Sequence, residues 1–279
     1  MHVAMMVTWY NPNDENINNI SEYLKFVDKL YIVDNSSVNN KKLIKNSKKI
    51  EYILNMKNLG IATALNIAAN KAIDDGYDFL VTMDQDSFLS KDNYDDMVNY
   101  INNNDMTNIG IVSPYHDIET NRRKPTTDVE EVLEVMTSGN FLNLDIYKKV
   151  GGFKDWLFID DVDIEYCLNL NKSGYKVIRL NNVKMNHKLG NTKVYKILNK
   201  RFIVSNHNAI RRYYMFRNMY YILEMYKDTF PEYCEFLYHV QKGQIRYVIL
   251  FEHDKINKLK AMRKGYIDYK NRVVGEYCE

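Results

Sequence analysis

The sequence is poor in cysteine, in long apolar runs and in net charge, and each of these absences argues against a class of protein. Its three cysteines, Cys167, Cys234 and Cys278, include no Cys-x-x-Cys pair, so we expect neither a disulfide framework nor a zinc site. No stretch approaches the roughly 18 apolar residues of a transmembrane helix, and the first residues lack the basic region and cleavage site of a signal peptide. We therefore expect a cytoplasmic protein.

The charge balance is close to neutral. A net charge of +2 is too small to attract nucleic acid to the protein as a whole, so no nucleic-acid partner is expected. With 279 residues, of which 46% are hydrophobic, the chain is long enough to form one large globular domain with a small appendage.

The first half of the sequence alternates short apolar runs, expected to be strands, with longer amphipathic segments, expected to be helices. This rhythm predicts an α/β fold with a mostly parallel sheet flanked by helices. The expected strands are His2–Thr8, Leu30–Asp34, Glu51–Met56, Phe79–Met83, Ile109–Ser113, Glu131–Thr137 and Lys176–Leu180. The expected helices are Asn16–Val27, Ile61–Asp75, Asn93–Asn103 and Asp160–Lys172, with a short one ending at Gly151-Gly152.

From about Asn208 the strand pattern gives way to long helical patterns rich in Tyr, Arg, Lys and Met. We therefore expect two domains, an α/β domain of residues 1–205 and a helical region of residues 206–279. Basic helices with many aromatic residues can lie at a membrane interface. The helical region is expected to make peripheral contact with the inner face of the cell membrane, to form a homodimer, or simply to cover the sheet.

The stretch Phe79–Ser87 is the most informative in the chain. Its apolar run is expected to be a buried strand that delivers Asp84 and Asp86 at its carboxyl end, where open α/β sheets bind ligands. Two carboxylates separated by one residue suit Mg²⁺ or Mn²⁺, which bind one or two carboxylates together with substrate phosphates. This Asp-x-Asp pair predicts a metal-held diphosphate, with an ordinary turn as the alternative.

Polar residues also follow the other expected strands of the first half. A ring and a carboxylate at adjacent strand ends could stack on a nucleotide base and accept its imide N–H, and a glycine turn could present amides to an anion. Ordinary turn chemistry explains the same residue types. The first expected strand ends at Thr8 and is followed by Tyr10 and Asn11, the second ends at Asp34, and Asn58 and Gly60 follow the third.

Four carboxylates within six residues open the helix expected at Asp160–Lys172. Acidic residues in a first turn are explained by the helix dipole. The apolar, aromatic run from Trp156 onward could also desolvate a carboxylate and raise its basicity, as a general base requires. Ser138 and Gly139 supply backbone that a substrate could approach closely.

Two later features have both a structural and a functional interpretation. His187 follows the last strand of the α/β region and is either structural or a contact to phosphate or metal. Residues 211–218 interleave arginines with tyrosines, and their spacing places Tyr214 beside Asn218 on one helix face. Arg217 is well matched to phosphate, whereas a solvated helix face is the alternative.

Taken in order, these motifs resemble those of the family 2 glycosyltransferases of the GT-A fold, most closely the bacterial rhamnosyltransferase branch. The motifs are Thr-x-Tyr-Asn-Pro, Val-Asp-Asn-Ser, Asn-x-Gly, Met-Asp-Gln-Asp-Ser, Ser-Gly-Asn, Val-Gly-Gly-Phe, Asp-Asp-Val-Asp-Ile-Glu, His-x-Leu-Gly and Arg-x-Tyr-Tyr-x-x-Arg-Asn. The resemblance runs from residue 3 to about residue 220. It implies a Rossmann-like GT-A domain, a nucleotide-sugar donor, and Mg²⁺ or Mn²⁺ as cofactor.

The resemblance also implies a role for each motif residue. Residues implied to bind the nucleotide are Thr8, Tyr10, Asn11, Asp34, Asn58, Gly60 and Asp84. Residues implied to bind the metal are Asp86, Asp84 and His187. The implied catalytic base is Asp161, with Asp160, which stands where the family usually has Glu, as the alternate. Residues implied to contact the acceptor or the diphosphate are Ser138, Gly139, Trp156, Tyr214 and Arg217. Asn169 stands where relatives usually have Arg.

The reaction that the resemblance implies is a single displacement that inverts the anomeric carbon. The expected donor is dTDP-L-rhamnose, and the expected acceptor is a cell-surface glycan or a lipid-linked saccharide. Because no Gln-x-x-Arg-Trp motif occurs, a processive polymerase is not expected. Two alternatives stay open, a haloacid-dehalogenase-type phosphatase and a non-catalytic module that binds nucleotide or glycan.

Overall fold

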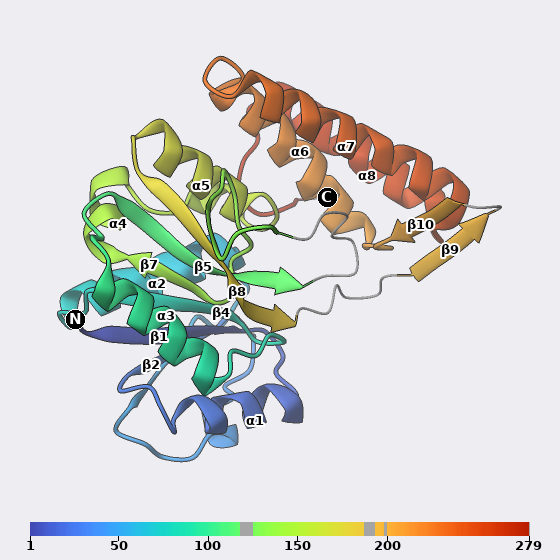
Figure 1. The fold of residues 1–279 in the computed structure, drawn as a ribbon. Helices are drawn as coiled ribbons and strands as arrows, with labels where there is room; N and C mark the ends of the chain where they lie inside the picture. Colours follow the sequence, from blue (N-terminus) through green and yellow to red (C-terminus); the bar gives the residue numbers. More distant parts are fainter. Residues whose placement is uncertain (118–124, 187–192, 198–199, 279) are drawn as a thin grey trace. The chain divides into compact units, whose positions relative to one another are not determined.

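In the computed structural model, the structure describes residues 1–117, 125–186, 193–197 and 200–278 (Figure 1). The chain forms two compact units. The first comprises Met1–Asp155 and Tyr166–His187, and the second comprises Trp156–Glu165 and Lys188–Glu279. The second unit thus includes two segments, residues 156–165 and 188–205, that the predicted boundary between residues 205 and 206 assigns to the first domain. The domain division itself stays a prediction.

The first unit is built on an eight-stranded mixed sheet with the strand order β3-β2-β1-β4-β7-β5-β8-β6. Parallel pairs join β1 to β2 and β4, β2 to β3, and β5 to β8, whereas β7 and β6 pair antiparallel to their neighbours. The α/β prediction is therefore confirmed. The strands are β1 (Val3–Trp9), β2 (Leu30–Asp34), β3 (Ile50–Leu54), β4 (Phe79–Asp84), β5 (Ile109–Asp117), β6 (Val129–Glu131), β7 (Asn140–Asn143) and β8 (Lys176–Asn186).

Two strands differ from the prediction. The strand expected over Glu131–Thr137 is wrong, because pairing there is limited to the short, exposed edge strand β6, which ends at Glu131. The fully buried strand β7 was not predicted, since four residues are too few to show a period. Sequence pattern identifies an apolar run, but it does not say which run finds a partner strand.

Helices flank the sheet of the first unit. One core cluster joins α1 and α3 to the sheet through Ile20, Met97, Met5 and Val81, and α2 packs its buried alanines against β1, β2 and β4. The four long helices expected in this part of the sequence are confirmed, with ends shifted by a few residues. The helices are α1 (Asp14–Tyr23), α2 (Gly60–Asp74), α3 (Lys91–Asn103), α4 (Leu144–Val150) and α5 (Val162–Lys172), with short 3₁₀ turns η1 (Lys41–Leu43) and η2 (Asp155–Leu157).

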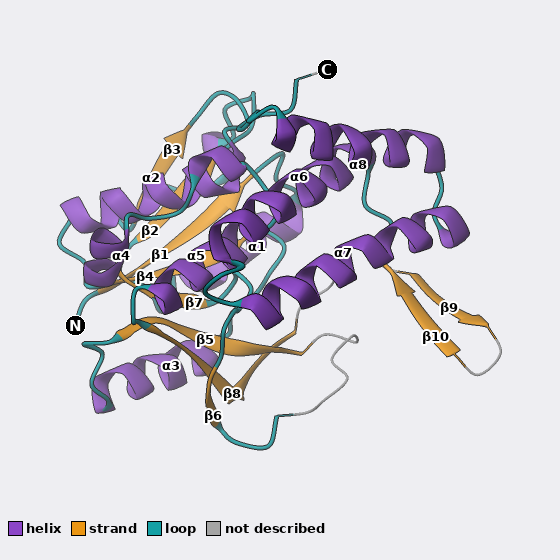
Figure 2. Ribbon diagram, turned by 90° about the horizontal axis from the view of Figure 1, so that it is seen from above, coloured by secondary structure: helices purple, strands orange, loops and turns teal. Residues whose placement is uncertain are grey.

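Three helices dominate the second unit: α6 (Ala209–Tyr226), α7 (Pro231–Phe251) and α8 (Lys255–Lys270) (Figure 2). Phe216, Val248 and Met262 form a core cluster between them. Gly265 allows α8 to approach α6 closely, since a Cβ there would lie 2.5 Å from the carbonyl oxygen of Tyr213. The predicted helical region from Asn208 is confirmed.

A hairpin of β9 (Lys193–Ile197) and β10 (Lys200–Val204) precedes these helices and was not predicted. Its rings pack on α7, where Tyr195 stacks on Phe251 with 5.0 Å between centroids. The second unit also buries an ionic group, in which Glu252 pairs with both Arg212 and Lys258. In the described part of the chain, no helix is long and apolar enough to cross a membrane.

Candidate active site

The carboxyl ends of β1, β2 and β4 lie side by side in the first unit. Thr8 pairs with Asp84 across β1 and β4, and Trp9 pairs with Asp34 across β1 and β2. Parallel strands end at the same edge, where open α/β sheets bind ligands. The register thus brings together predicted site residues that are separated by up to 76 positions in the sequence.

The side chain of Gln85 ties the loop after β1 to the loop after β4. Its amide oxygen accepts from the Tyr10 N–H at 2.8 Å, and its amide nitrogen donates to the Tyr10 carbonyl at 3.2 Å. Asn11, which has a positive φ of 49°, donates its N–H to the Ser36 hydroxyl at 2.8 Å. Tyr10 is 50% exposed, so its ring is accessible for the predicted stacking on a base.

Asp34 organises the loop after β2. Its carboxylate accepts from the Ser36 N–H at 2.9 Å, the Asn40 amide at 2.9 Å and the Tyr52 hydroxyl at 2.6 Å. Burial and this hydrogen bond to Asp34 raise the pKa of Tyr52, which therefore stays a protonated donor. Asp34 is 0% exposed, so a nucleotide reaches it only if the loop moves, and its nucleotide contact stays a prediction.

The Asp84 carboxylate is held by Ser138 from the turn before β7. The Ser138 hydroxyl accepts from the Asp84 N–H at 2.9 Å and donates to a carboxylate oxygen of Asp84 at 2.6 Å. The Ser138 carbonyl in turn contacts the His116 ring nitrogen at 2.7 Å. Ser138 is buried, and this structural contact differs from the acceptor contact predicted for it.

Gly139 completes the same turn. Its φ is +82°, and a Cβ there would lie 2.8 Å from a ring carbon of Pro114, so only glycine fits without a shift. Its N–H donates to the Thr82 carbonyl at 2.7 Å, which aligns the turn with the end of β4. Gly139 therefore positions Ser138, and the acceptor role predicted for Gly139 is not tested by these contacts.

Asp84 and Asp86 are the candidate metal ligands. Asp84 is partly buried at the last position of β4, and Asp86 is exposed two residues later. Among the described residues, no group of three or more His, Cys, Asp or Glu side chains is placed to hold a metal. Two hard oxygen donors nevertheless fit Mg²⁺ or Mn²⁺, because these ions keep several waters and take further ligands from substrate phosphates. His187, the third predicted ligand, lies outside the described residues.

Asn58 and Gly60 form a tight turn into α2. The Asn58 side chain accepts from the Gly60 N–H at 3.0 Å, and Gly60 has a φ of +82°. The Asn35 amide, just after β2, donates to the Gly60 carbonyl at 3.0 Å. This turn is therefore fixed to the β2 end of the site, although its predicted anion contact is untested.

The acidic segment, residues Trp156–Asp161, belongs to the second unit and leads into α5. Both carboxylate oxygens of Asp160 accept from the Arg211 guanidinium, with Nε 3.2 Å from Oδ2. Asp161 is only 7% exposed, and its carbonyl accepts the Glu165 N–H at 2.9 Å, which begins the helix. The buried Glu165 carboxylate accepts from the Tyr226 hydroxyl at 2.7 Å. Of the two candidate bases, Asp160 is thus paired with an arginine, and Asp161 is buried at the start of α5.

Trp156, Tyr214 and Arg217 also lie in the second unit. The Trp156 ring meets Tyr221 edge to face, with 5.1 Å between centroids. The Tyr214 ring stacks on Phe158 at 5.2 Å. Arg217 is 0% exposed and donates to main-chain carbonyls, including that of Leu157 at 2.9 Å. A contact between Arg217 and a diphosphate would require the guanidinium to leave these carbonyls.

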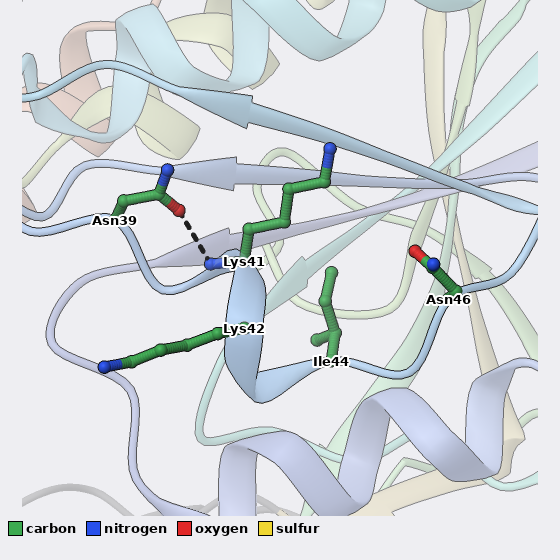
Figure 3. Close-up of a pocket in the computed structure, with 5 residues that line it drawn as sticks. All are labelled: Asn39, Lys41, Lys42, Ile44 and Asn46. Carbon is green, nitrogen blue, oxygen red and sulfur yellow. Dashed lines mark hydrogen bonds between the residues drawn. The ribbon is translucent and has the colours of Figure 1, made fainter.

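A surface hollow lies in the loop between β2 and β3 (Figure 3). Its lining includes the side chains of Lys41 and Lys42, and the Asn39 side chain accepts the Lys41 N–H at 2.9 Å. No predicted site residue lines this hollow.

Comparison with known proteins places these motifs in a family. Residues 14–166, more than half of the chain, match the profile of glycosyl transferase family 2. The chain is 29% identical to the dTDP-rhamnosyl transferase RfbF of Shigella flexneri over 79% of each chain.

Solved structures agree in fold. The structure of S. aureus TarS residues 1–349 aligns with a TM-score of 0.60 at 13% identity, covering 98% of this chain and 82% of that one. GalNAc-T7, solved with UDP, GalNAc and Mn²⁺, aligns with a TM-score of 0.60 at 12% identity and covers 98% of this chain. The chain spans about half (56%) of the GalNAc-T7 chain. The predicted GT-A fold with a C-terminal helical extension is confirmed. The chain belongs to glycosyl transferase family 2, as its motifs predicted.

Proposed function

We propose that this glycosyltransferase moves L-rhamnose from dTDP-L-rhamnose to a hydroxyl of a cell-surface glycan or lipid-linked saccharide, with inversion at the anomeric carbon. The observation that carries the proposal is the Asp84/Asp86 pair at the end of β4, in register with the nucleotide candidates of β1 and β2. Similarity to a dTDP-rhamnosyl transferase supports the choice of donor. The phosphatase alternative is not supported, because residues 14–166, which include the Asp-x-Asp pair, match glycosyl transferase family 2.

Asp84 and Asp86 are proposed to hold Mg²⁺ or Mn²⁺ together with the donor diphosphate. When bound, such an ion neutralises the charge that develops on the leaving diphosphate. The hydroxyl of Ser138 orients Asp84 as a supporting partner, in the manner of outer-shell hydrogen bonds at metal sites. Tyr10 is proposed to stack on the thymine ring.

Asp161 is proposed as the general base. It accepts the proton of the acceptor hydroxyl while that oxygen forms a bond to C1 and the bond from C1 to the diphosphate oxygen breaks. One displacement inverts the configuration and requires no nucleophile from the protein. Asp161 is preferred to Asp160 because it stands at the base position that the resemblance of the Asp-Asp-Val-Asp-Ile-Glu motif implies.

The acceptor is proposed to reach the enzyme at the inner face of the cell membrane. Along α7, Phe236 and Leu250 are 59% and 65% exposed, and the exposed Lys242 and Arg246 lie between them in the sequence. Such a mixed apolar and basic surface suits an anionic membrane interface. The alternative is that the same helices form a homodimer interface.

The donor proposal is tested by calorimetric titration of the protein with dTDP-L-rhamnose, UDP-sugars and GDP-sugars, with Mn²⁺, with Mg²⁺ and with EDTA. We expect dTDP-L-rhamnose to bind most tightly and only with metal. The Asp86→Asn variant should bind it at least about tenfold more weakly. Metal-independent binding, or a preference for UDP- or GDP-sugars, would contradict the proposal. Tight binding without turnover would identify a non-catalytic module.

A further inference from the structure

The backbone of the acidic segment adopts an unusual conformation. Phe158, Asp160 and Asp161 have positive φ angles of 69°, 61° and 60°, a region that non-glycine residues rarely occupy. Such residues persist only where the surrounding structure holds them in place. The orientation of the Asp161 side chain therefore depends on the contacts that stabilise this backbone conformation.

Asn218 of α6 provides one part of that support. Its side-chain amide nitrogen lies 3.0 Å from the Leu157 carbonyl, 2.8 Å from the Ile159 carbonyl and 2.8 Å from the Asp160 carbonyl. Asn218 is 0% exposed, so water does not compete for these acceptors. One buried amide thus contacts three carbonyls, each of which directly precedes a residue with a positive φ.

Arg217, the preceding residue of α6, provides the other part. Its Nη2 donates to the Trp156 carbonyl at 3.2 Å and the Leu157 carbonyl at 2.9 Å, and its Nε donates to the Asn218 side-chain oxygen at 3.0 Å. The last bond orients the Asn218 amide so that its nitrogen faces the acidic segment.

The C-terminal residues close the same network. Arg217 Nη1 donates to the Gly275 carbonyl at 2.6 Å, and the Gly275 N–H donates to the Trp156 carbonyl at 2.7 Å. The Tyr277 N–H donates to the hydroxyl of Tyr214, whose ring stacks on Phe158. Both helix α6 and the C-terminal residues therefore form contacts that hold the acidic segment in place.

We propose that Arg217 and Asn218 are positioning residues for catalysis, and that they hold Asp160 and Asp161 in the left-handed conformation that aims Asp161 at the acceptor hydroxyl. This inference rests on the proposed function, in which Asp161 is the base. It gives Arg217 a role other than the diphosphate contact predicted from the sequence. A guanidinium is required there because its planar N–H groups donate to three carbonyls at once. A lysine ammonium does not reproduce this geometry.

The test compares Arg217→Lys and Asn218→Ala with the wild-type chain. The reaction followed is dTDP release from dTDP-L-rhamnose with water as the acceptor probe, and deuterium uptake is measured in peptides that cover residues 156–165. We expect kcat to fall roughly tenfold to a hundredfold, because small misplacements of a reacting group cost that much. The donor KM should stay within about twofold, and deuterium uptake should rise.

Arg212→Lys is the matched control. Arg212 is an equally buried arginine of the same helix, but its guanidinium pairs with Glu252, and its other hydrogen-bond partners are Met215, Gln244 and Ser205. This variant should lose thermal stability comparably to Arg217→Lys, yet keep wild-type kcat per folded molecule and wild-type deuterium uptake over residues 156–165. A chain ending at Val273 lacks the Gly275 carbonyl. It should have a lower kcat and a higher deuterium uptake over residues 156–165, as expected for Arg217→Lys. This truncated chain replaces a point variant that fails to fold.

The outcomes separate this inference from the proposed function. If Arg217→Lys and Asn218→Ala match Arg212→Lys in kcat or in deuterium uptake, the positioning role is wrong, even where Asp161→Asn is inactive. If Asp161→Asn keeps wild-type turnover, the proposed base is wrong, whatever the uptake measurements give.

Discussion

At the scale of single residues, hydrogen bonds decide how each carboxylate of the site is presented. Asp84 is oriented by a buried hydroxyl, Asp34 is enclosed by three donors, and Asp160 is paired with Arg211. Asp86 remains exposed to solvent. These carboxylates therefore differ in how far their surroundings fix them.

Ser138→Ala tests the orientation of Asp84. Removing the hydroxyl that donates to the Asp84 carboxylate at 2.6 Å should weaken metal-dependent donor binding by about tenfold, as lost outer-shell bonds do at metal sites. The measurement is calorimetric titration with dTDP-L-rhamnose and Mn²⁺. Ser113→Ala is the control, since Ser113 is equally buried and its hydroxyl bonds to the Pro114 carbonyl instead. Equal affinities for both variants would show that Ser138 does not support Asp84.

His207 gives the second unit a defined response to pH. Burial and the nearby Arg211 cation lower the pKa of His207 from 6.5 to about 4. As the pH falls from about 6.5 toward about 4, the unfolded chain therefore takes up a proton that the folded chain refuses, and stability is lost over this window. At pH 5 the loss amounts to at most about 2 kcal/mol.

Urea denaturation at pH 7 and pH 5 checks this effect. The wild-type chain should lose more free energy of unfolding between the two pH values than His207→Gln, which does not titrate. Identical losses in the two proteins would mean that His207 titrates normally in the folded chain.

The candidate site was predictable at this scale only where local sequence carries the signal. Asp84 and Asp86 follow an apolar run directly, so their place at a strand end could be expected. The contact between Ser138 and Asp84 spans 54 residues, and the Asn218 contact with Leu157 spans 61, so no local pattern reveals either. Both depend on which elements the fold brings together.

At the scale of elements, periodicity predicted the long helices and the parallel strands, because each shows several repeats of its pattern. It missed β7 and the hairpin β9–β10, where short strands are defined by their partners. It also gave no indication that the acidic segment would bond to α6. Tertiary pairing decides these features, and a single sequence does not encode it locally.

Two helical glycines test how closely α6 and α8 approach. Gly265→Ala should destabilise the chain by about 1–3 kcal/mol, because the added Cβ would meet the Tyr213 carbonyl oxygen at 2.5 Å. Gly243→Ala is the control, since a Cβ there meets nothing within 4 Å and alanine should stabilise the helix by about 0.5–1 kcal/mol. Urea denaturation measures both. Stabilisation by Gly265→Ala would contradict the close approach.

At the scale of the whole molecule, the chain divides into two compact units, and each of them carries residues that the sequence predicts for the site. The candidates for nucleotide and metal lie in the first unit, and the candidate base lies in the second. Helix α5 begins in the second unit and continues into the first, so the main chain links the base directly to the α/β sheet unit.

Membrane association is the prediction that belongs to this scale. The wild-type chain should float with vesicles that contain anionic lipid and should be released by salt, because a basic surface is screened at high ionic strength. The double variant Phe236→Glu, Leu250→Glu should float much less. Absence of flotation at low salt would contradict the membrane proposal and favour a homodimer, which light scattering would detect.

The central claim is that Asp161 is the base of a metal-assisted sugar transfer. The most direct test is turnover of dTDP-L-rhamnose by Asp161→Asn and by Asp160→Asn, beside the wild-type protein, with donor affinity measured on the same preparations. We expect Asp161→Asn to lose roughly 10²–10⁴-fold in kcat while binding the donor normally, and Asp160→Asn to keep measurable turnover. Wild-type turnover in Asp161→Asn would contradict this claim.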